Sequence, residues 1–493
     1  MMGHQPTPQP KLFYTGFQLD KRVRRDHPLR KISQVIDFDF IYKEVAETYG
    51  ENGNVSVPPP ILLKLMLLLV FYNVRSEREL METLPERLDW LWFLGYDLDD
   101  EVPNHSVLSK ARSRWGSEVF QRFFERVVRQ CVAAGLVNGR KIFVDSSLID
   151  ADASQDSVVD TRDLHEQLSQ KYRQLEARLD EAPSARAPGP YTEENLRYVS
   201  ATDPDAALVK RGESKLRYQS HRAVEGGSEI ITATALTPGD VSEDQLLMVL
   251  KKDHEATTGE SVQTLVADSK YGTKENYLAC RDAGIQAHIP AFQGGTNKRL
   301  EKRGLFMEDR FVFDAKRDVF ICPAGQELRR RTLHAKRQSI EYTALKRICA
   351  VCELRDQCTK SKSGRTVHRH LRQDELDEML RVSKSTQSRC DLRHRQHVCE
   401  GSFGAAKRYG YKRARWRRLW RVEIQNYLIC TMQNITKLIK HRSKRCYAAA
   451  SLRQDWRHDL LISAVQRLHC NANHLIRCIE EVWSNLVLQT ESA

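Results

Sequence analysis

Two aspartates follow short apolar segments that have the composition of β-strands. Asp145 ends the segment Ile142-Phe-Val-Asp, and Asp268 ends Leu265-Val-Ala-Asp. Removing a carboxylate from water at such a place is costly unless it is paired or binds a cation, so both aspartates are candidate metal ligands. A single aspartate at a strand end more often caps a helix or forms a turn, and that alternative stays open for each of them.

A third carboxylate, Glu400, begins a probable helix in a strongly basic part of the chain. A lone acid among many bases ordinarily forms a surface ion pair. Three carboxylates from two strands and one helix can instead hold two Mg²⁺ (or Mn²⁺) ions about 4 Å apart. One ion would activate water or a 3′-hydroxyl, and the other would stabilise the leaving oxygen during in-line attack on a phosphate. Asp145, Asp268 and Glu400 together therefore predict metal-assisted phosphoryl transfer.

The positive charge of the chain is concentrated around Glu400. The 493 residues include 78 Lys and Arg and 65 Asp and Glu, and the net charge is +13, yet residues 381–445 alone hold 18 basic and three acidic residues. Such a concentration is typical of a nucleic-acid contact, although a solvated helix face is the alternative. Trp416 and Trp420, one helical turn apart, either stack on a base or pack on the core. The expected DNA contacts are Arg395, Lys407, Arg408, Lys412, Arg413, Arg415, Arg417 and Arg418.

Four of the twelve cysteines lie between the second and third carboxylates: Cys322, Cys349, Cys352 and Cys358. Two of them have C-x-x-C spacing, and tetrahedral Zn²⁺ takes four such soft ligands. A small insertion without a core of its own would gain stability from such a site, so a structural zinc is expected, with free buried thiols as the alternative. The remaining cysteines are scattered, which suits a reducing compartment.

The elements that must position these side chains follow from periodicity and turn residues. Prolines 58–60 before an apolar run and the pair Ser76/Glu79 predict helix starts, so residues 1–138 are expected to form a helical, DNA-binding domain. Within it, residues 104–115 form either a DNA-reading helix or an ordinary amphipathic one.

Beyond residue 139 strand and helix patterns alternate, which predicts an α/β core. We expect its first part at residues 139–291, with a flexible insertion at about 154–214. A cysteine-bearing insertion domain should follow at 292–388, and a basic helical region at 389–446 should complete the core. A helical extension is expected at 447–493.

Several classes of protein are disfavoured. The N-terminus has no signal-peptide pattern, and the longest apolar run, Ile61–Tyr72, is too short to span a bilayer, so a cytoplasmic protein without a membrane partner is expected. The chain has neither the GxxxxGK[ST] phosphate loop nor the nucleophile elbow of serine hydrolases.

Asp145, Asp268 and Glu400, with their flanking motifs, resemble the DDE triad of insertion-sequence transposases. One branch of that family has a helical N-terminal domain, and it is similar to this chain at Asp26-His-Pro-Leu-Arg-Lys-Ile, Arg75-Ser-Glu-Arg-Glu-Leu, Trp92-Phe-Leu-Gly-Tyr, Val102-Pro-Asn-His-Ser, Thr202-Asp-Pro-Asp-Ala, Thr237-Pro-Gly-Asp and Ala267-Asp-Ser-Lys-Tyr-Gly. In many relatives the glutamate lies in Tyr-x2-Arg-x3-Glu-x6-Lys. Here Lys407 occupies the lysine position, but Arg393 and Gln396 replace the tyrosine and arginine, and Arg395 lies one place away.

The resemblance implies an RNase H-like mixed-sheet core that is split by insertions. It further implies binding of terminal inverted repeats and target DNA, Mg²⁺-dependent cleavage and strand transfer, and a homodimer in the assembled complex. Lys407 would contact a DNA phosphate near the reacting end, and Asp150 and Asp152 rank below Asp145 as metal ligands. A transposase-derived DNA-binding protein without strand transfer, and a metal-dependent nuclease, are the alternatives.

Overall fold

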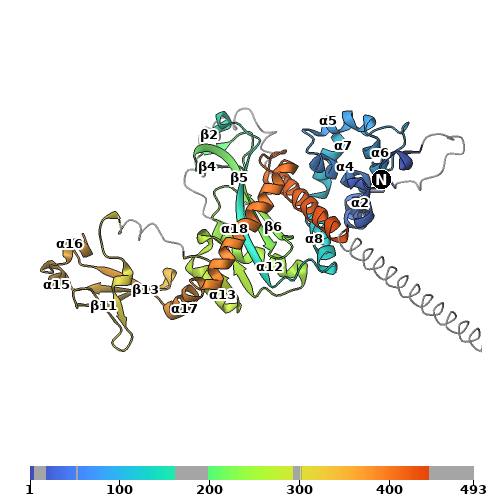
Figure 1. Ribbon diagram of the computed structural model, residues 1–493. Coiled ribbons are helices and arrows are strands. Elements are labelled where there is room, and N and C mark those ends of the chain that lie inside the picture. Colours follow the sequence, from blue (N-terminus) through green and yellow to red (C-terminus); the bar gives the residue numbers. More distant parts are fainter. Residues whose placement is uncertain (5–17, 52–53, 161–197, 292–299, 301, 444–493) are drawn as a thin grey trace, which may run out of the picture. The chain divides into compact units, whose positions relative to one another are not determined.

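The computed structural model describes residues 1–4, 18–51, 54–160, 198–291, 300 and 302–443 (Figure 1). The chain divides into two units, residues 1–435 and residues 436–493. In the second unit only residues 436–443 are described, and they are helical. The helical extension predicted at 447–493 therefore lies outside the described residues. Nowhere in the described ranges is a helix long and apolar enough to cross a membrane.

The N-terminal part is helical, as predicted. Its helices are α1 (Leu19–Arg22), α2 (Pro28–Val35), α3 (Phe40–Val45), η1 (Ala46–Thr48), α4 (Pro59–Phe71), α5 (Glu77–Thr83), η2 (Leu84–Glu86), α6 (Leu88–Leu94), α7 (Ser106–Trp115) and α8 (Glu118–Ala133). α4 is central, because its sequence is apolar on all sides and eleven of its 13 residues are buried. At the start of α5 the Ser76 hydroxyl accepts the backbone N–H of Glu79 at 3.1 Å, which confirms the predicted helix start.

The core is a mixed sheet, which confirms the predicted fold class. Its strands are β1 (Lys141–Asp150), β4 (Ala207–Arg211), β5 (Glu213–Glu225), β6 (Ile231–Pro238), β7 (Thr264–Val266) and β8 (Gln286–His288). Their order is β4-β5-β1-β7-β8, and β6 also pairs with β5. β5 is antiparallel to both of its neighbours β1 and β6, whereas β7 and β8 run parallel to β1. Three antiparallel strands followed by two parallel ones are the arrangement expected for an RNase H-like core.

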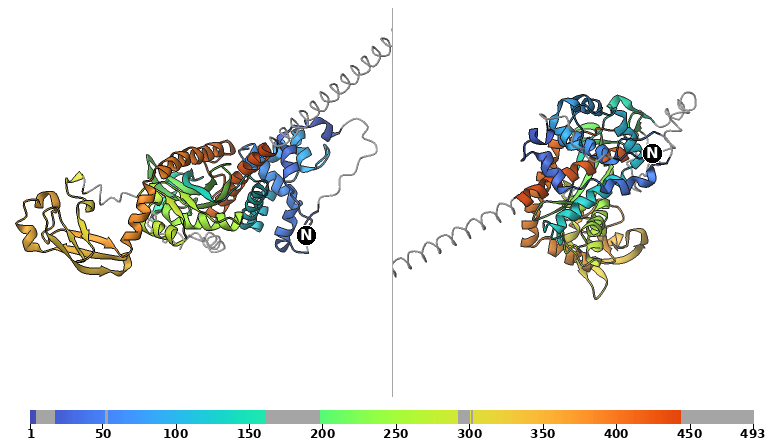
Figure 2. Two further views of the ribbon diagram at one scale, coloured as in Figure 1. Left: turned by 60° about the horizontal axis from the view of Figure 1, so that its bottom comes forward. Right: turned by 90° about the vertical axis from the view of Figure 1, so that its right-hand side faces the viewer.

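The two faces of the sheet have different partners. Successive side chains of a strand point to opposite faces, and in β1 Ile142 and Val144 belong to the apolar cluster with α12 (Leu247–Thr258) and α13 (Lys274–Asp282). On the other face, Phe143 packs edge-on against His394 of α18 (Thr386–Ala406). Figures 1 and 2 show α18, in orange, crossing the sheet, where it contacts β1, β7 and β8. Asp145 shares a face with Phe143 and therefore points towards α18.

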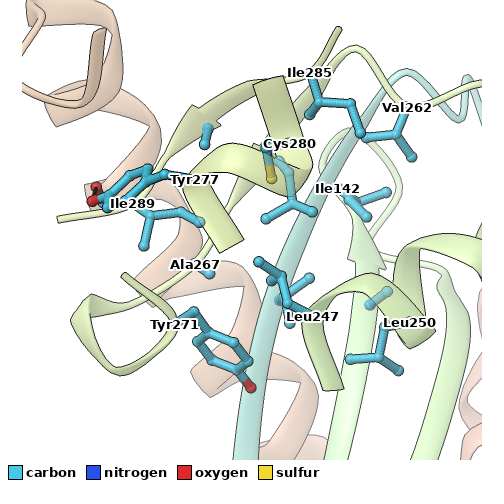
Figure 3. Packing of buried hydrophobic residues seen from close by; sticks show 14 of the residues in the cluster. Ile142, Leu247, Leu250, Val262, Ala267, Tyr271, Tyr277, Cys280, Ile285 and Ile289 are labelled. Atoms are coloured by element: carbon cyan, nitrogen blue, oxygen red, sulfur yellow. Dashed lines mark hydrogen bonds between the residues drawn. The ribbon is translucent and has the colours of Figure 1, made fainter. Parts of the chain in front are cut away.

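The apolar cluster shows where the insertion ends and the core resumes. Leu247, Ala267, Tyr271 and Tyr277 are among its buried residues (Figure 3). Leu376 and Met379 of α17 (Gln373–Ser383) also belong to it, so α17 is part of the core rather than of the insertion predicted at 292–388.

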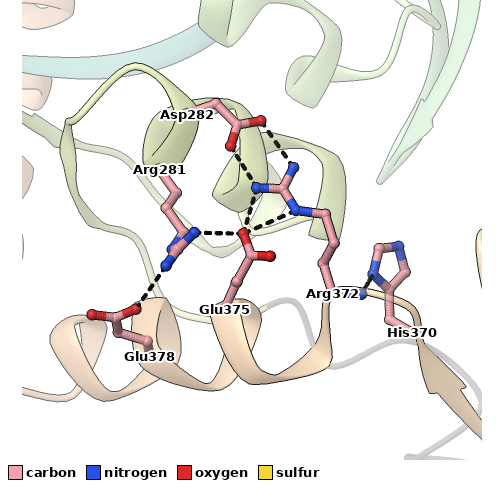
Figure 4. A network of polar contacts seen from close by, with 6 residues as sticks. All are labelled: Arg281, Asp282, His370, Arg372, Glu375 and Glu378. Atoms are coloured by element: carbon pink, nitrogen blue, oxygen red, sulfur yellow. Dashed lines mark hydrogen bonds and ion pairs between the residues drawn. The ribbon is translucent and has the colours of Figure 1, made fainter.

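Ion pairs hold α17 against α13. Arg372 donates to both carboxylate oxygens of Asp282, and Arg281 pairs with Glu375 at 2.5 Å and with Glu378 at 3.3 Å (Figure 4). The chain leaves the main sheet after β8 and thus returns to the same part of the core in α17.

The cysteine-bearing insertion forms a second sheet. Its antiparallel strands β9 (Val312–Asp314), β10 (Val319–Ile321), β11 (Glu327–His334), β12 (Ser339–Ala344) and β13 (Thr366–His370) lie in the order β13-β12-β11-β10-β9, with the short helices α15 (Lys346–Ala350) and α16 (Arg355–Cys358). Phe320, Leu328, Tyr342 and Val367 form a buried apolar cluster of its own. The expectation of an insertion without a core is therefore wrong, because alternating apolar residues in these strands bury one face.

The segment predicted as a flexible insertion at about 154–214 contains regular structure at its described ends. η3 (Gln155–Ser157) and β2 (Val158–Asp160) precede residues 161–197, and β3 (Tyr198–Ser200) pairs with β2. β4 follows and joins the main sheet. Residues 161–197, with the Pro/Ala/Gly stretch, lie outside the described residues.

Candidate active site

Asp145 and Asp268 meet because their strands are parallel neighbours. Phe143 of β1 is opposite Val266 of β7, and continuing this register by two residues brings Asp145 beside Asp268 on the same face. Asp268 lies two residues after the end of β7 and accepts the backbone N–H of Lys270 at 3.0 Å, so it also caps η5 (Ser269–Tyr271). Asp145 does not end its strand as predicted, because β1 continues to Asp150 through its long pairing with β5.

Asp145 is largely buried and lies close to other charged side chains. Burial raises the pKa of Asp145, the Arg395 guanidinium lowers it, and the charges of Asp268 and Glu243 raise it, with a net rise. Nη1 of Arg395 lies 2.8 Å from Oδ2 of Asp145, and only 20% of the Asp145 side chain is exposed. Arg395 was predicted as a DNA contact, but in this structure its charge compensates the carboxylate. The charges of Asp268 and Glu243 thus oppose the effect of Arg395 on the pKa of Asp145.

Glu400 lies on the helix that covers this face, but it is not brought into contact with the two aspartates. Its side chain is exposed, and Oε1 accepts a hydrogen bond from Nε2 of Gln396 at 3.1 Å. The preceding residue, Cys399, is buried, and the charges of Asp145 and Asp268 contribute to the raised pKa of its thiol. Glu400 is therefore about 100° around α18 from the side that faces the aspartates. Throughout the described residues, no group of three or more His, Cys, Asp or Glu side chains is placed so that it could hold a metal ion.

Sequence reasoning missed a further carboxylate, Glu243, in η4 (Glu243–Leu246). Only 6% of this residue is exposed, and its carboxylate forms an ion pair with Lys270. Burial raises the pKa of Glu243, but the hydrogen bond and charge of Lys270, with hydrogen bonds from Ser146 and Gln219, hold it below the ordinary value. A cavity of about 540 Å³ lined by Gln219, Glu243 and Lys270 lies here. The motif Thr237-Pro-Gly-Asp lies just upstream of Glu243, but nothing in the sequence indicates that Glu243 is buried beside Asp145.

The rival carboxylates are bound elsewhere. Asp150 accepts from Arg217 at 2.9 Å, and Asp152 pairs with Arg413 at 2.9 Å and with Arg417 at 3.4 Å. Both follow Asp145 on the chain, but their charges are already compensated, which supports the lower rank given to them.

The residues predicted to contact DNA fall into two groups. Lys407, Arg408, Lys412, Arg413 and Arg417 are exposed. Arg418 instead pairs with Asp205 at 3.7 Å, and Arg415 donates to the carbonyl of Val74 and to Oδ1 of Asn73. Trp416 donates from Nε1 to Glu77 at 3.1 Å, which favours the packing role for this tryptophan.

Two family models match the chain. Residues 17–114 match the "Transposase domain (DUF772)", and residues 321–439 match the "Transposase DDE domain". The chain carries a DDE transposase domain. This domain belongs to phosphoryl-transfer enzymes. The predicted resemblance to DDE transposases and the predicted enzyme class are therefore confirmed, and the domain implies transposition of DNA.

No curated protein matches the chain. Among solved structures, the chain is similar to one entitled "Cryo-EM structure of piggyBac transposase synaptic complex with hairpin DNA (SNHP)". The identity is 8%, the match covers 83% of this chain and 72% of that chain, and the TM-score is 0.34.

The match to the DDE transposase domain includes Glu400, the basic residues after it and all four cysteines of the insertion. The four thiols, all partly buried and none in a disulfide, line one cavity of about 20 Å³. Burial raises the pKa of Cys358, and the neighbouring Cys349, Cys322 and Cys352 raise it further. A cavity of this volume holds about one atom of the size of water. The four thiols thus line one small cavity, but, as stated above, they are not placed to bind a metal ion. The zinc site therefore stays a prediction.

Proposed function

We propose that this chain is the transposase of an insertion sequence, with Asp145, Asp268 and Glu400 as its catalytic metal ligands. It would bind the terminal inverted repeats of its element in the bacterial cytoplasm, cut the DNA, and join the freed 3′-hydroxyl to target DNA as a homodimer. The observation that carries this proposal is the register of β1 and β7, which supports two partly buried carboxylates lying side by side beneath the helix that carries Glu400.

The two aspartates fit a divalent cation such as Mg²⁺. Both present hard carboxylate oxygens, and the charge of Asp268 contributes to the raised pKa of Asp145, as expected where a cation is needed for compensation. When bound, such ions activate the attacking oxygen and stabilise the leaving one. Glu400 would complete the ligand set by turning its side chain away from Gln396.

The residues of the chain supply the remaining functions. Arg395 keeps the Asp145 carboxylate oriented and compensates part of its charge. Lys407 caps the C-terminal end of α18 in a helical backbone conformation and follows Glu400 by seven residues, close to two helical turns, so both side chains start from nearly the same side of the helix. Lys407 and Arg408 are exposed and basic, which suits binding of the phosphates next to the reacting bond.

The proposal is tested on a duplex that carries the inverted repeat of the element. Cleavage and strand-transfer products are measured with Mg²⁺, and DNA binding is measured separately, for the wild type, Glu400→Gln and Glu118→Gln. Glu118 is an exposed glutamate in the first turn of α8, so its replacement removes the same charge far along the chain from the site. We expect Glu400→Gln to lose both products while it keeps DNA binding, and Glu118→Gln to keep all three.

Unchanged products in Glu400→Gln would remove Glu400 from the site. Cleavage by the wild type without joining would favour the metal-dependent nuclease. Binding without either product would favour the DNA-binding protein derived from a transposase.

A further inference from the structure

A basic cavity of about 570 Å³ lies where the N-terminal helices meet the segment that follows α18. It is lined by residues of α5 and α7, by the turn before α5, and by four residues of the segment 415–421. Six arginines contribute to its walls: Arg75, Arg78, Arg112, Arg415, Arg417 and Arg421. The carboxylates in the lining are only Glu77 and Asp152, so the cavity is strongly positive.

Both carboxylates are already engaged. Glu77 forms an ion pair with Arg112 and accepts a hydrogen bond from Trp416, and Asp152 pairs with Arg413 and Arg417. Within the part of the chain that the structure describes, no carboxylate lies within ion-pair distance of Arg75, Arg78 or Arg421. These three guanidinium groups therefore form no ion pair among the described residues, although the charges of Asp203 and Glu77 act on Arg421 from a greater distance.

The walls of the cavity are held by close contacts. Arg415 donates to Val74 and Asn73, and the Arg112 guanidinium stacks on Trp416 at 4.0 Å from the ring centroid. Gly410 has a φ of +79°, and a Cβ at this residue would lie 2.4 Å from Oδ1 of Asn73. The chain can approach this closely only because residue 410 is glycine. The arginines are thus presented from a preorganised frame, which lowers the entropy cost of binding.

Three of the six arginines are poorly solvated, whereas Arg75, Arg78 and Arg417 are exposed. Burial lowers the pKa of Arg112 and Arg415, and burial together with Arg418 lowers that of Arg421. An anion would relieve this electrostatic cost. Guanidinium groups bind phosphate through paired N–H donors, which makes phosphate the anion that several converging arginines suit best.

We infer that this cavity binds backbone phosphates of the duplex DNA on which the active site acts. The inference rests on the proposed function. Asp152, in the wall of the cavity, follows Asp145 by seven residues, an extended length of roughly 23 Å. This distance corresponds to roughly seven base pairs at about 3.4 Å each, so one duplex can reach both places.

The test measures DNA binding without metal, so that it does not depend on catalysis. The probe is a labelled duplex carrying the end of the element, and anisotropy is followed over a range of KCl concentrations. The cavity variant is R75Q/R78Q. The matched control is R122Q/R129Q, which removes two arginine charges from α8, where both side chains have carboxylate partners. R75K/R78K retains the charges and separates their loss from a loss of packing.

We expect R75Q/R78Q to bind roughly tenfold more weakly and to reduce the slope of log K against log[KCl] by about 2, since each phosphate contact contributes about 0.9. The control and R75K/R78K should keep the wild-type slope. Wild-type affinity and slope in R75Q/R78Q would overturn the inference, as would an equal loss in the control. Failure of the wild type itself to bind the duplex would instead overturn the proposed function.

Discussion

The ion pair between Arg395 and Asp145 offers the sharpest test of the site. The two side chains are 14% and 20% exposed and lie 2.8 Å apart at their closest atoms. Two unit charges about 4 Å apart attract by about 4 kcal/mol at an effective dielectric constant of about 20, and desolvation of both groups offsets part of this. We therefore expect a double-mutant cycle of Arg395→Gln and Asp145→Asn to give a coupling free energy of about 2 kcal/mol.

The pH dependence of Arg395→Gln has a definite sign. The pKa of Asp145 in the folded protein is raised, so its ionised form costs stability as the pH rises through that pKa. Loss of Arg395 raises the pKa further and increases this cost at neutral pH. The stability deficit of Arg395→Gln should therefore be complete at pH 7 and shrink as acid protonates Asp145.

Unfolding by urea at several pH values measures both effects, and circular dichroism shows whether each variant is folded. Calorimetric titration with Mg²⁺ adds an independent readout: Arg395→Gln should bind the ion more tightly, because the guanidinium competes for the same carboxylate, and Asp145→Asn more weakly. A coupling below about 0.5 kcal/mol between folded variants, or tighter binding of Mg²⁺ by Asp145→Asn, would refute the electrostatic picture of the site.

Three further predictions concern other residues. Lys270→Gln removes the ion-pair partner of the buried Glu243 and leaves it only the hydrogen bonds from Ser146 and Gln219, so it should cost about 1–3 kcal/mol at pH 7. Because Lys270 holds the pKa of Glu243 low, the loss of stability measured by urea unfolding should shrink below pH 4.5, the ordinary pKa of a glutamate, and a loss that persists in acid would contradict this. Lys407→Gln should reduce the salt slope of DNA binding by about 1, and an unchanged slope would remove Lys407 from the phosphate contacts. If the four thiols bind Zn²⁺, elemental analysis should find one ion per chain and a strongly reduced content in Cys352→Ser, whereas equal zinc in both proteins would exclude the site.

Local patterns predicted much of the framework. The Ser76/Glu79 pair, the apolar run of α4 and the strands before Asp145 and Asp268 all depend on neighbouring residues, so the sequence could indicate them. The end of β1 was placed too early because its last residues pair with β5, about 70 positions away. Pairing of that kind leaves little trace in a local pattern.

The parts of the site that escaped prediction depend on tertiary contacts. The basic residues around Arg395 predict a DNA contact, but α18 directs its side chain towards Asp145. The burial of Glu243 arises from the approach of η5 and β5, which supply Lys270 and Gln219, so no local pattern indicates it. The sequence around Trp416 does not distinguish a tryptophan that stacks on a base from one that joins two parts of the protein.

The second sheet has a consequence for how such proteins change over time. It buries an apolar cluster of its own, and α17 brings the chain back against α13 and β8, so the entire insertion is attached at one locality of the core. The entropy of closing a loop grows only logarithmically with its length. A change in the length of this module therefore need not shift the register of β1 and β7, which brings Asp145 beside Asp268.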